Sequence, residues 1–263
     1  MRRHLWKIAS LVAPASAVLL FAPPAHAVST VDYAALGDSY SSGVGTSGAT
    51  GSCLRSPQGY PQLWVNTHSV SSFQFVACSG ATTDDVLANQ LTALNAGTDL
   101  VSITIGGNDT GFADTLTTCQ LGSDSSCQTA VNDARTSATT TLPGKLDTTY
   151  AAIRSHAPNA RVVVLGYPRL FELTSSCGFF GLDEFKRTIL NQGADDLEAV
   201  IADRAAAAGF TFVDTRPIFT GHGVCGSSPW LNGFELFDVT SSYHPNASGY
   251  ADGFLPSLDS VTG

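Results

Sequence analysis

Short apolar runs alternate with longer segments of helical periodicity along most of the chain. The runs are rich in Val, Ile, Leu and Phe, and several have no polar position, as expected of strands that are covered on both faces. They predict five strands, at residues 33–36, 73–77, 100–105, 161–165 and 211–213.

The segments between these runs predict helices. Thr82 or Thr83 caps the first helix, because two aspartates follow at once and suit the positive end of a helix dipole. A second helix lies within residues 128–156 and is expected to break near the Pro-Gly pair at 143–144.

A third helix is predicted over residues 183–208, where Gly209 ends it. Strands that alternate with helices imply a parallel sheet with helices on both faces. No linker divides the chain, and its length suits one domain. The pattern therefore predicts an α/β fold, a single three-layer domain with a parallel five-stranded sheet between two layers of helices.

Polar loops follow the first three predicted strands. Ser39 comes after the first strand, Gly80 after the second and Asn108 after the third. Because ligands bind beyond the carboxyl ends of strands in open parallel sheets, these three loops are expected to meet at one site.

The first 27 residues are typical of a secretion signal. Three basic residues precede a short apolar segment at residues 8–21, and small residues end at Ala27. A membrane span is less consistent with this segment, because it falls short of the ~20 apolar residues that a spanning helix needs. We expect residues 1–27 to be removed and residues 28–263 to form a secreted, extracellular domain.

The expected mature chain is acidic. The whole sequence has 13 basic and 22 acidic residues, and removal of three basic residues leaves ten, so that the net charge changes from -9 to -12. Such a surface repels nucleic acid and anionic bilayers at long range. We therefore expect no nucleic-acid partner and no integral membrane association, and at most a transient contact with a lipid interface.

Six cysteines lie in the expected mature part. An even number behind a secretion signal indicates disulfides, and spacing alone does not choose among the fifteen pairings that six cysteines allow. Only Cys119 and Cys127 are close enough in sequence to suggest a local pair, across a short polar loop. The spacing of cysteines and histidines gives no zinc motif, so we expect no metal site.

Ser39 and His244 are the minimum parts for nucleophilic acyl transfer. Ser39 lies where the first predicted strand turns into a helix, a place where serine often serves only as a helix cap. A neutral imidazole within hydrogen-bond reach takes the hydroxyl proton as the serine oxygen attacks. That chemistry needs no metal or organic cofactor.

Four sequence blocks carry a family resemblance. They are residues 35–43 (ALGDSYSSG), 78–82 (CSGAT), 105–109 (IGGND) and 243–250 (YHPNASGY). Their serine, glycine, asparagine and histidine occur in the order of the SGNH, or GDSL-type, hydrolase family. The chain resembles that family over nearly its whole mature length, and the resemblance implies the flavodoxin-like SGNH hydrolase fold.

The resemblance also implies residue roles. Ser39 corresponds to the nucleophile and His244 to the base, and the oxyanion hole corresponds to donors from Ser39, Gly80 and Asn108. It further favours sequential disulfides, which are Cys53–Cys78, Cys119–Cys127 and Cys177–Cys225.

Other polar residues are assigned structural roles. Asp38 and Asp109 are expected to order their turns. His68 and His156 have the sequence context of a loop and of a helix end. His222, between two glycines, is the one rival to His244 as the base.

One position departs from the family pattern. Many members have an aspartate three residues before the catalytic histidine, and here that position is Ser241. A main-chain carbonyl can hold the imidazole instead. We expect the carbonyl of Ser242 to do so, with the carbonyl of Trp230 and the side chain of Asp238 as alternatives.

Apolar residues in loops suggest the substrate. They are Phe112, Leu170-Phe171, Phe179-Phe180-Gly181-Leu182 and Phe234-Glu235-Leu236-Phe237. Core packing is the other interpretation of this set. The whole chain is most similar to compact secreted bacterial lipases and phospholipases of the A type, which implies hydrolysis of lipid esters, of sn-1 type on phospholipids. A carbohydrate acetyl esterase and a non-catalytic secreted binding module are the alternatives. Nothing in the sequence indicates a protein partner, and we expect a monomer.

Overall fold

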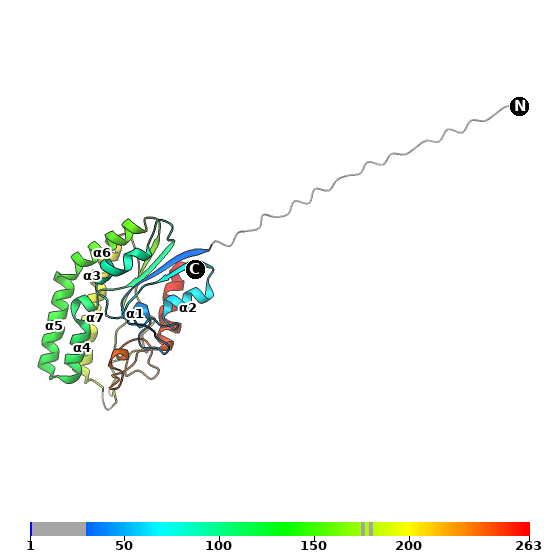
Figure 1. The fold of residues 1–263 in the computed structure, drawn as a ribbon. Helices are drawn as coiled ribbons and strands as arrows, with labels where there is room; N and C mark the ends of the chain where they lie inside the picture. The colour runs from blue at the N-terminus through cyan, green and yellow to red at the C-terminus, as the bar shows by residue number, and fades with distance from the viewer. Residues whose placement is uncertain (2–29, 175–176, 179–180) are drawn as a thin grey trace.

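In the computed structural model, five parallel strands form a central sheet in the order β2–β1–β3–β4–β5 (Figure 1). The structure describes Met1 and residues 30–174, 177–178 and 181–263. The expected secretion signal, apart from Met1, lies outside the described residues. The predicted three-layer α/β fold with a five-stranded parallel sheet is confirmed.

The strands are β1 Val31–Gly37, β2 Val70–Phe75, β3 Leu100–Thr104, β4 Arg161–Leu165 and β5 Thr211–Val213. Every residue of β3 is buried, as its continuous apolar pattern predicts. The sequence locates all five strands; the bounds of β4 and β5 are those predicted, and the bounds of β1, β2 and β3 differ.

The largest difference lies in β2, which begins at Val70 and ends at Phe75, earlier than the predicted range 73–77. Its first half is polar, so the apolar pattern misses it. Ser72 pairs with Asp32 of β1, and its hydroxyl donates to the Asp32 carboxylate at 2.6 Å. Pairing at the edge of the sheet, rather than burial, thus extends this strand.

The described helices are α1 Ser39–Ser42, α2 Tyr60–Thr67, α3 Thr83–Asp85, α4 Phe112–Leu121, α5 Asp124–Thr140, α6 Leu142–His156, α7 Glu184–Ala207 and α8 Leu255–Thr262. Short 3-10 or π segments lie at Val86–Gln90, Leu91–Ala93, Asn108–Thr110, Val239–Ser241 and Gly249–Phe254.

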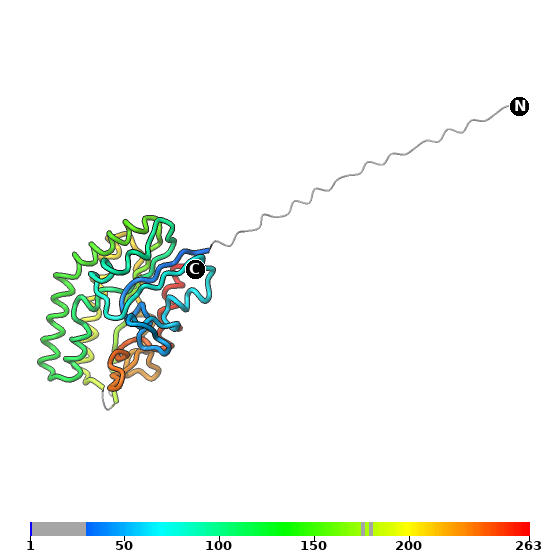
Figure 2. Tube along the Cα trace, viewed as in Figure 1, coloured from blue at the N-terminus to red at the C-terminus, as the bar shows by residue number. Residues whose placement is uncertain are grey.

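The helices cover both faces of the sheet. Helices α2 and α8 pack together on one side, and α3, α6 and α7 lie on the other (Figure 1). Helix α5 packs against α7, α4 packs against α5, and both extend beyond the sheet (Figure 1). The tube in Figure 2 shows that the loops of the C-terminal third gather at the same end as the turn that follows β1.

Two predicted helices are confirmed with small changes. Thr82 caps α3 in a capping box with Asp85, and Asp183 caps α7, accepting from the amide of Lys186. The segment 128–156 is two helices, α5 and α6, which meet at Thr141 rather than at the Pro-Gly pair. Pro143 lies in the first turn of α6, where the missing N–H removes no helix bond.

The sequence pattern does not predict α2, α4 or α8. Helix α4 is rich in threonine, which has a low helix propensity. A disulfide between Cys119 and Cys127 joins α4 to the start of α5, so this bond connects two helices rather than closing a polar loop. The other disulfides are Cys53–Cys78 and Cys177–Cys225.

Candidate active site

The serine, glycine, asparagine and histidine of the four sequence blocks line one cavity of about 310 Å³. Ser39 begins α1 directly after β1, Gly80 follows β2, and Asn108 follows β3. His244 comes from the loop before α8. The carboxyl ends of three parallel strands thus meet at this site, as the topology requires.

The turn after β1 packs closely against β3. Gly37 has φ of 117°, and a Cβ there would lie 2.4 Å from the carbonyl oxygen of Thr104 on β3. The Asp38 carboxylate accepts from the amide of Tyr40 at 2.9 Å and so caps α1. Burial raises the pKa of Asp38 to about 7, and a hydrogen bond from Tyr167 opposes the rise.

Ser39 and His244 are in direct contact. The Nε2 atom of His244 lies 2.8 Å from the Ser39 hydroxyl oxygen, and its Nδ1 atom lies 3.0 Å from the carbonyl oxygen of Ser242. A carbonyl oxygen only accepts, so Nδ1 carries the proton and Nε2 is left to accept from the serine. This is the tautomer that a general base for Ser39 requires.

The imidazole is kept neutral. Burial lowers the pKa of His244 to about 4, and hydrogen bonds to the backbone of Ser242 and Thr240 and the charge of Asp238 oppose this effect. A histidine with this pKa is unprotonated at neutral pH and is ready to accept a proton.

The structure distinguishes the three groups considered for orienting His244. The Ser242 carbonyl contacts the imidazole. The Trp230 carbonyl instead accepts from the amide of Asn246 at 2.9 Å. The Asp238 carboxylate accepts from the hydroxyl of Ser241 at 2.6 Å and caps a 3-10 turn, so its effect on His244 is only through space.

Tyr243 lies between Ser242 and His244, and no role in the site was predicted for it from the sequence. Its φ is 62°, an uncommon conformation for a residue with a side chain, and it turns the chain between the Ser242 carbonyl and the His244 ring. Its hydroxyl donates to Gln120 of α4 at 2.5 Å, and its carbonyl accepts from Tyr40 at 2.7 Å. These two contacts hold the strained residue in place.

Gly80 and Asn108 line the same cavity as Ser39 and His244. Gly80 has φ of 80°, which favours glycine at this turn. The Asn108 side-chain nitrogen donates to the Ala81 carbonyl at 2.9 Å, which orients the amide. An amide nitrogen carries two hydrogens, so this bond leaves a second one for a ligand.

Asp109 has the structural role predicted for it. Its carboxylate accepts from the Thr83 amide at 3.0 Å and from the Thr83 hydroxyl at 2.6 Å. These bonds tie the loop after β3 to the start of α3, next to the Gly80 turn. The glycine and asparagine blocks are therefore fastened to each other.

The three other histidines in the described part of the chain do not line the cavity. His68 stacks on Trp64, and His222 stacks on Trp230 with ring centroids 3.7 Å apart. His156 contacts the Ala152 carbonyl near the end of α6. His222, the rival considered for the base, is held by stacking rather than presented to Ser39.

Apolar side chains form most of the rest of the cavity wall. Of the residues expected there, Phe112, Leu170 and Phe234 line it. Phe171 and Leu182 are core residues instead. Of the other apolar residues expected there, Leu236 and Phe237 are exposed, and Phe179-Phe180 lie outside the described residues.

Two helices supply wall residues that the loop-based expectation missed. Leu116 lies on α4, one turn after Phe112, and Leu197 lies on α7. The helical spacing of Phe112 and Leu116 is the signal that would have revealed them as one face. The cavity thus lies between α4, α7 and the loops at the sheet edge.

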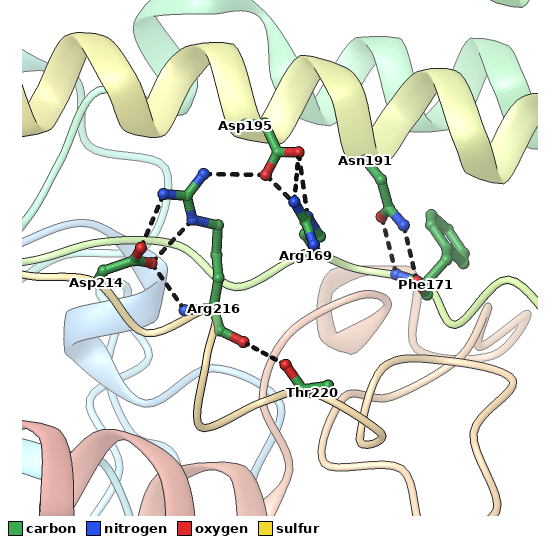
Figure 3. Close-up of polar contacts among 7 residues, drawn as sticks. All are labelled: Arg169, Phe171, Asn191, Asp195, Asp214, Arg216 and Thr220. Atoms are coloured by element: carbon green, nitrogen blue, oxygen red, sulfur yellow. Dashed lines mark hydrogen bonds and ion pairs between the residues drawn. The ribbon is translucent and has the colours of Figure 1, made fainter.

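The loop after β4 reaches the cavity through Leu170 and is fastened to α7 (Figure 3). The Asn191 side chain accepts from the Phe171 amide at 3.1 Å and donates to its carbonyl at 2.8 Å. Asp195 pairs with Arg169 at 2.9 Å and with Arg216 at 3.0 Å (Figure 3). These contacts hold the apolar wall against the helix.

Within the described ranges, no group of three or more His, Cys, Asp or Glu side chains has the arrangement of a metal site. The same part of the chain contains no helix with the length and apolar character to cross a membrane.

Comparison with known proteins agrees with this geometry. Residues 35–251 match the GDSL-like Lipase/Acylhydrolase family. The chain is 52% identical over 258 residues to Lipase 1 of Streptomyces coelicolor, an alignment that covers 96% of both proteins.

Two solved structures are similar over the whole fold. The extracellular lipase from Streptomyces rimosus has 54% identity and a TM-score of 0.86, covering 89% of this chain and 100% of that one. Phospholipase A1 from Streptomyces albidoflavus NA297 has 49% identity and the same TM-score of 0.86, covering 88% and 99%. The resemblance drawn from the four sequence blocks is confirmed, and the chain belongs to the GDSL-like lipase/acylhydrolase family.

Proposed function

We propose that this protein is a secreted serine esterase that hydrolyses carboxylic esters of lipids, as a lipase or as a phospholipase A of sn-1 type. The observation that carries the proposal is the hydrogen bond between Ser39 and His244 at an apolar cavity. It joins a nucleophile with its base beside a wall suited to an acyl chain.

The reaction follows from the tautomer of His244. Its Nε2 atom accepts the proton of the Ser39 hydroxyl as the serine oxygen attacks the ester carbonyl. The ester carbon–oxygen bond then breaks, and the imidazolium gives that proton to the leaving alcohol. A water molecule, activated by the same nitrogen, hydrolyses the acyl-enzyme and releases the fatty acid.

Three donors are proposed to hold the negative charge that develops on the carbonyl oxygen. Ser39 is the first residue of α1, and amides in the first turn of a helix have no partner within the helix. The Gly80 amide and the Asn108 side chain line the same cavity. Loss of one such donor typically costs about 2.7–4 kcal/mol of barrier lowering.

The cavity supports a lipid rather than an acetyl substrate. Its volume of about 310 Å³ and its Phe and Leu lining suit an acyl chain, whereas an acetyl group would leave most of this apolar surface uncovered. Two relatives with about half of their residues identical to this chain are a lipase and a phospholipase A1. A carbohydrate acetyl esterase has no specific support here, and a non-catalytic module would not need the Ser39–His244 contact.

Secretion is part of the proposal. Residues 1–27 would be the signal peptide and residues 28–263 the catalytic domain. Three disulfides favour an oxidising compartment, and the similar lipase from Streptomyces rimosus is extracellular. N-terminal sequencing of the secreted protein tests the cleavage site after Ala27.

A transient contact with a lipid surface is also proposed. Leu236, Phe237 and Val239 are exposed, and they belong to the loop that supplies Phe234 to the cavity wall. Such apolar exposure beside a binding site marks an interaction surface. The chain is acidic, so binding to zwitterionic vesicles should exceed binding to anionic ones. Replacing Phe237 with Ser should weaken vesicle binding without changing hydrolysis of a soluble ester.

The central test is hydrolysis of short-chain and long-chain p-nitrophenyl esters by residues 28–263. We expect turnover in the unaltered protein, a preference for acyl chains longer than acetyl, and loss of turnover in Ser39→Ala and His244→Ala. Turnover that survives Ser39→Ala, or a folded unaltered protein without turnover, would refute the proposed esterase activity of Ser39. A phosphatidylcholine with distinguishable acyl chains at its two positions then tests the sn-1 preference.

A further inference from the structure

We propose that Tyr167 is a positioning residue whose hydroxyl group joins the turn before Ser39 to the loop before Asn108. This inference rests on the proposed function, because it assigns Tyr167 a role in the reaction of Ser39. Tyr167 lies two residues after the end of β4, and none of the four family blocks contains it.

The Tyr167 hydroxyl makes one bond to each side of the site. It donates to the Asp38 carboxylate, and it accepts from the Gly107 amide at 3.0 Å. Asp38 directly precedes Ser39, and Gly107 directly precedes Asn108. One hydroxyl group thus connects Asp38 and Gly107, the residues that precede two proposed oxyanion donors. These donors follow different strands of the sheet, β1 and β3.

The bridge is buried and rigid. Tyr167 is 7% exposed and Asp38 is 1% exposed, so water competes little for these bonds. The Tyr167 amide donates to the Glu198 side chain of α7 at 2.6 Å, which fixes the backbone. Its ring packs edge-on against Tyr40, with centroids 5.1 Å apart.

Gly107 fits the ring closely. A Cβ at this position would lie 3.2 Å from the hydroxyl oxygen and from Cζ of Tyr167. The φ of Gly107 is -59°, so its backbone does not require glycine, and the tyrosine is the neighbour that a side chain here would press against. The amide of residue 107 therefore reaches the hydroxyl because that residue lacks a side chain.

The bridge matters because oxyanion stabilisation depends on distance. A further link between the two strand ends, from the Asp38 amide to the Thr104 carbonyl at 3.0 Å, lies deeper in the sheet. The Tyr167 hydroxyl is the link next to the donors themselves. A displacement of ~1 Å at a reacting group can reduce the rate by about 10²-fold.

The test is Tyr167→Phe, which removes only the hydroxyl. We expect kcat to fall by about 10- to 100-fold and KM for a short soluble ester to change by less than about threefold, because the donors act on the transition state. Combination with Asn108→Ala should lose less than the product of the two single effects, because both changes impair the same oxyanion contact.

Tyr150→Phe is the matched control. Tyr150 is buried like Tyr167, but its hydroxyl has no hydrogen-bond partner among the described residues, so this variant should keep the kcat of the unaltered protein. If Tyr167→Phe does not fold, Asp38→Asn weakens the bridge from its other end, because an amide cannot replace the charge-assisted bond to the carboxylate. The asparagine oxygen still caps Tyr40, while its nitrogen replaces the acceptor of the Tyr167 hydroxyl.

The outcomes separate the two proposals. An unaltered protein without ester turnover refutes the proposed function itself. An active protein in which Tyr167→Phe retains full kcat refutes only the bridge, and so do effects of Tyr167→Phe and Asn108→Ala that multiply in the double variant. A lowered kcat with unchanged KM, together with a double variant that loses less than the product, supports the positioning role.

Discussion

The Nδ1 atom of His244 lies 3.0 Å from the main-chain carbonyl oxygen of Ser242, two residues earlier in the same loop. The group that contacts this imidazole nitrogen is therefore local and uncharged. A carboxylate in this place would stabilise the imidazolium and raise the pKa of the histidine. Here the carbonyl fixes the tautomer, while burial lowers the pKa to about 4.

This arrangement predicts activity in mild acid. The base works in its neutral form, so kcat/KM should rise with pH and reach half its maximum near the His244 pKa of about 4, rather than near 6.5. Hydrolysis of a soluble ester from about pH 3.5 to 8, with folding monitored in parallel, tests this expectation. Asp38, with a pKa of about 7, also titrates within this pH range. A midpoint near 6.5 that persists in Asp38→Asn would contradict the assignment to His244.

Asp238 should be dispensable for catalysis. Its carboxylate caps a 3-10 turn and does not contact the imidazole, so Asp238→Asn should keep kcat within about tenfold, against losses near 10⁴-fold where an aspartate orients the base. Asp238 raises the pKa of His244, and its removal should shift the acid limb to lower pH. The measurement is the pH profile of both proteins. A loss of several thousandfold would mean that Asp238 reaches His244 during the reaction.

Phe112 is expected to limit the length of the acyl chain. Phe112 and Leu197 line both the catalytic cavity and a smaller cavity between α4, α5 and α7. Phe112→Ala should join the two and improve kcat/KM for long-chain esters relative to short ones, by up to about fourfold for each methylene newly buried, at ~0.8 kcal/mol each.

Leu116→Ala is the control for this change. Leu116 lies on the same helix and lines the first cavity but not the second, so its removal enlarges the first cavity without opening the second one. The ratio of palmitoyl to octanoyl ester hydrolysis is the quantity to compare. Equal ratios in the two variants would show that Phe112 does not separate the cavities.

Glu198 is expected to reduce stability at neutral pH. Burial raises its pKa to about 8, so the folded protein keeps a proton that the unfolded chain releases near pH 4.5. Stability should therefore fall as the pH rises from about 4.5 to 8, by on the order of a few kcal/mol, and level off above that. Glu198→Gln stays neutral and should lose this slope, so that its Tm exceeds that of the unaltered protein increasingly towards pH 8.

Thermal unfolding of both proteins at several pH values measures the difference. Glu184→Gln, which removes an exposed carboxylate from the same helix, controls for the change in net charge. Parallel curves for Glu198→Gln and the unaltered protein would mean that Glu198 is ionised in the folded state.

The strands and the main sequence blocks of the site could be predicted because each is recognised from a short continuous segment of the sequence. A continuous apolar run such as β4 can be stable only where both faces are covered, so its position follows from the residues themselves. Ser39, Gly80 and Asn108 each lie within five residues of the end of a strand, and parallel strands bring their ends to one edge. The sequence alone therefore determined the fold class and the meeting of these three loops.

The contacts that complete the site depended on tertiary structure. The Ser242 carbonyl contacts His244 across Tyr243, whose positive φ is accompanied by contacts with Tyr40 and Gln120. The helical cavity wall and the Tyr167 bridge likewise join residues that are far apart in the chain. No local pattern encodes such pairs, because each residue has a conventional role in its own segment and gains its partner only when the sheet brings the segments together.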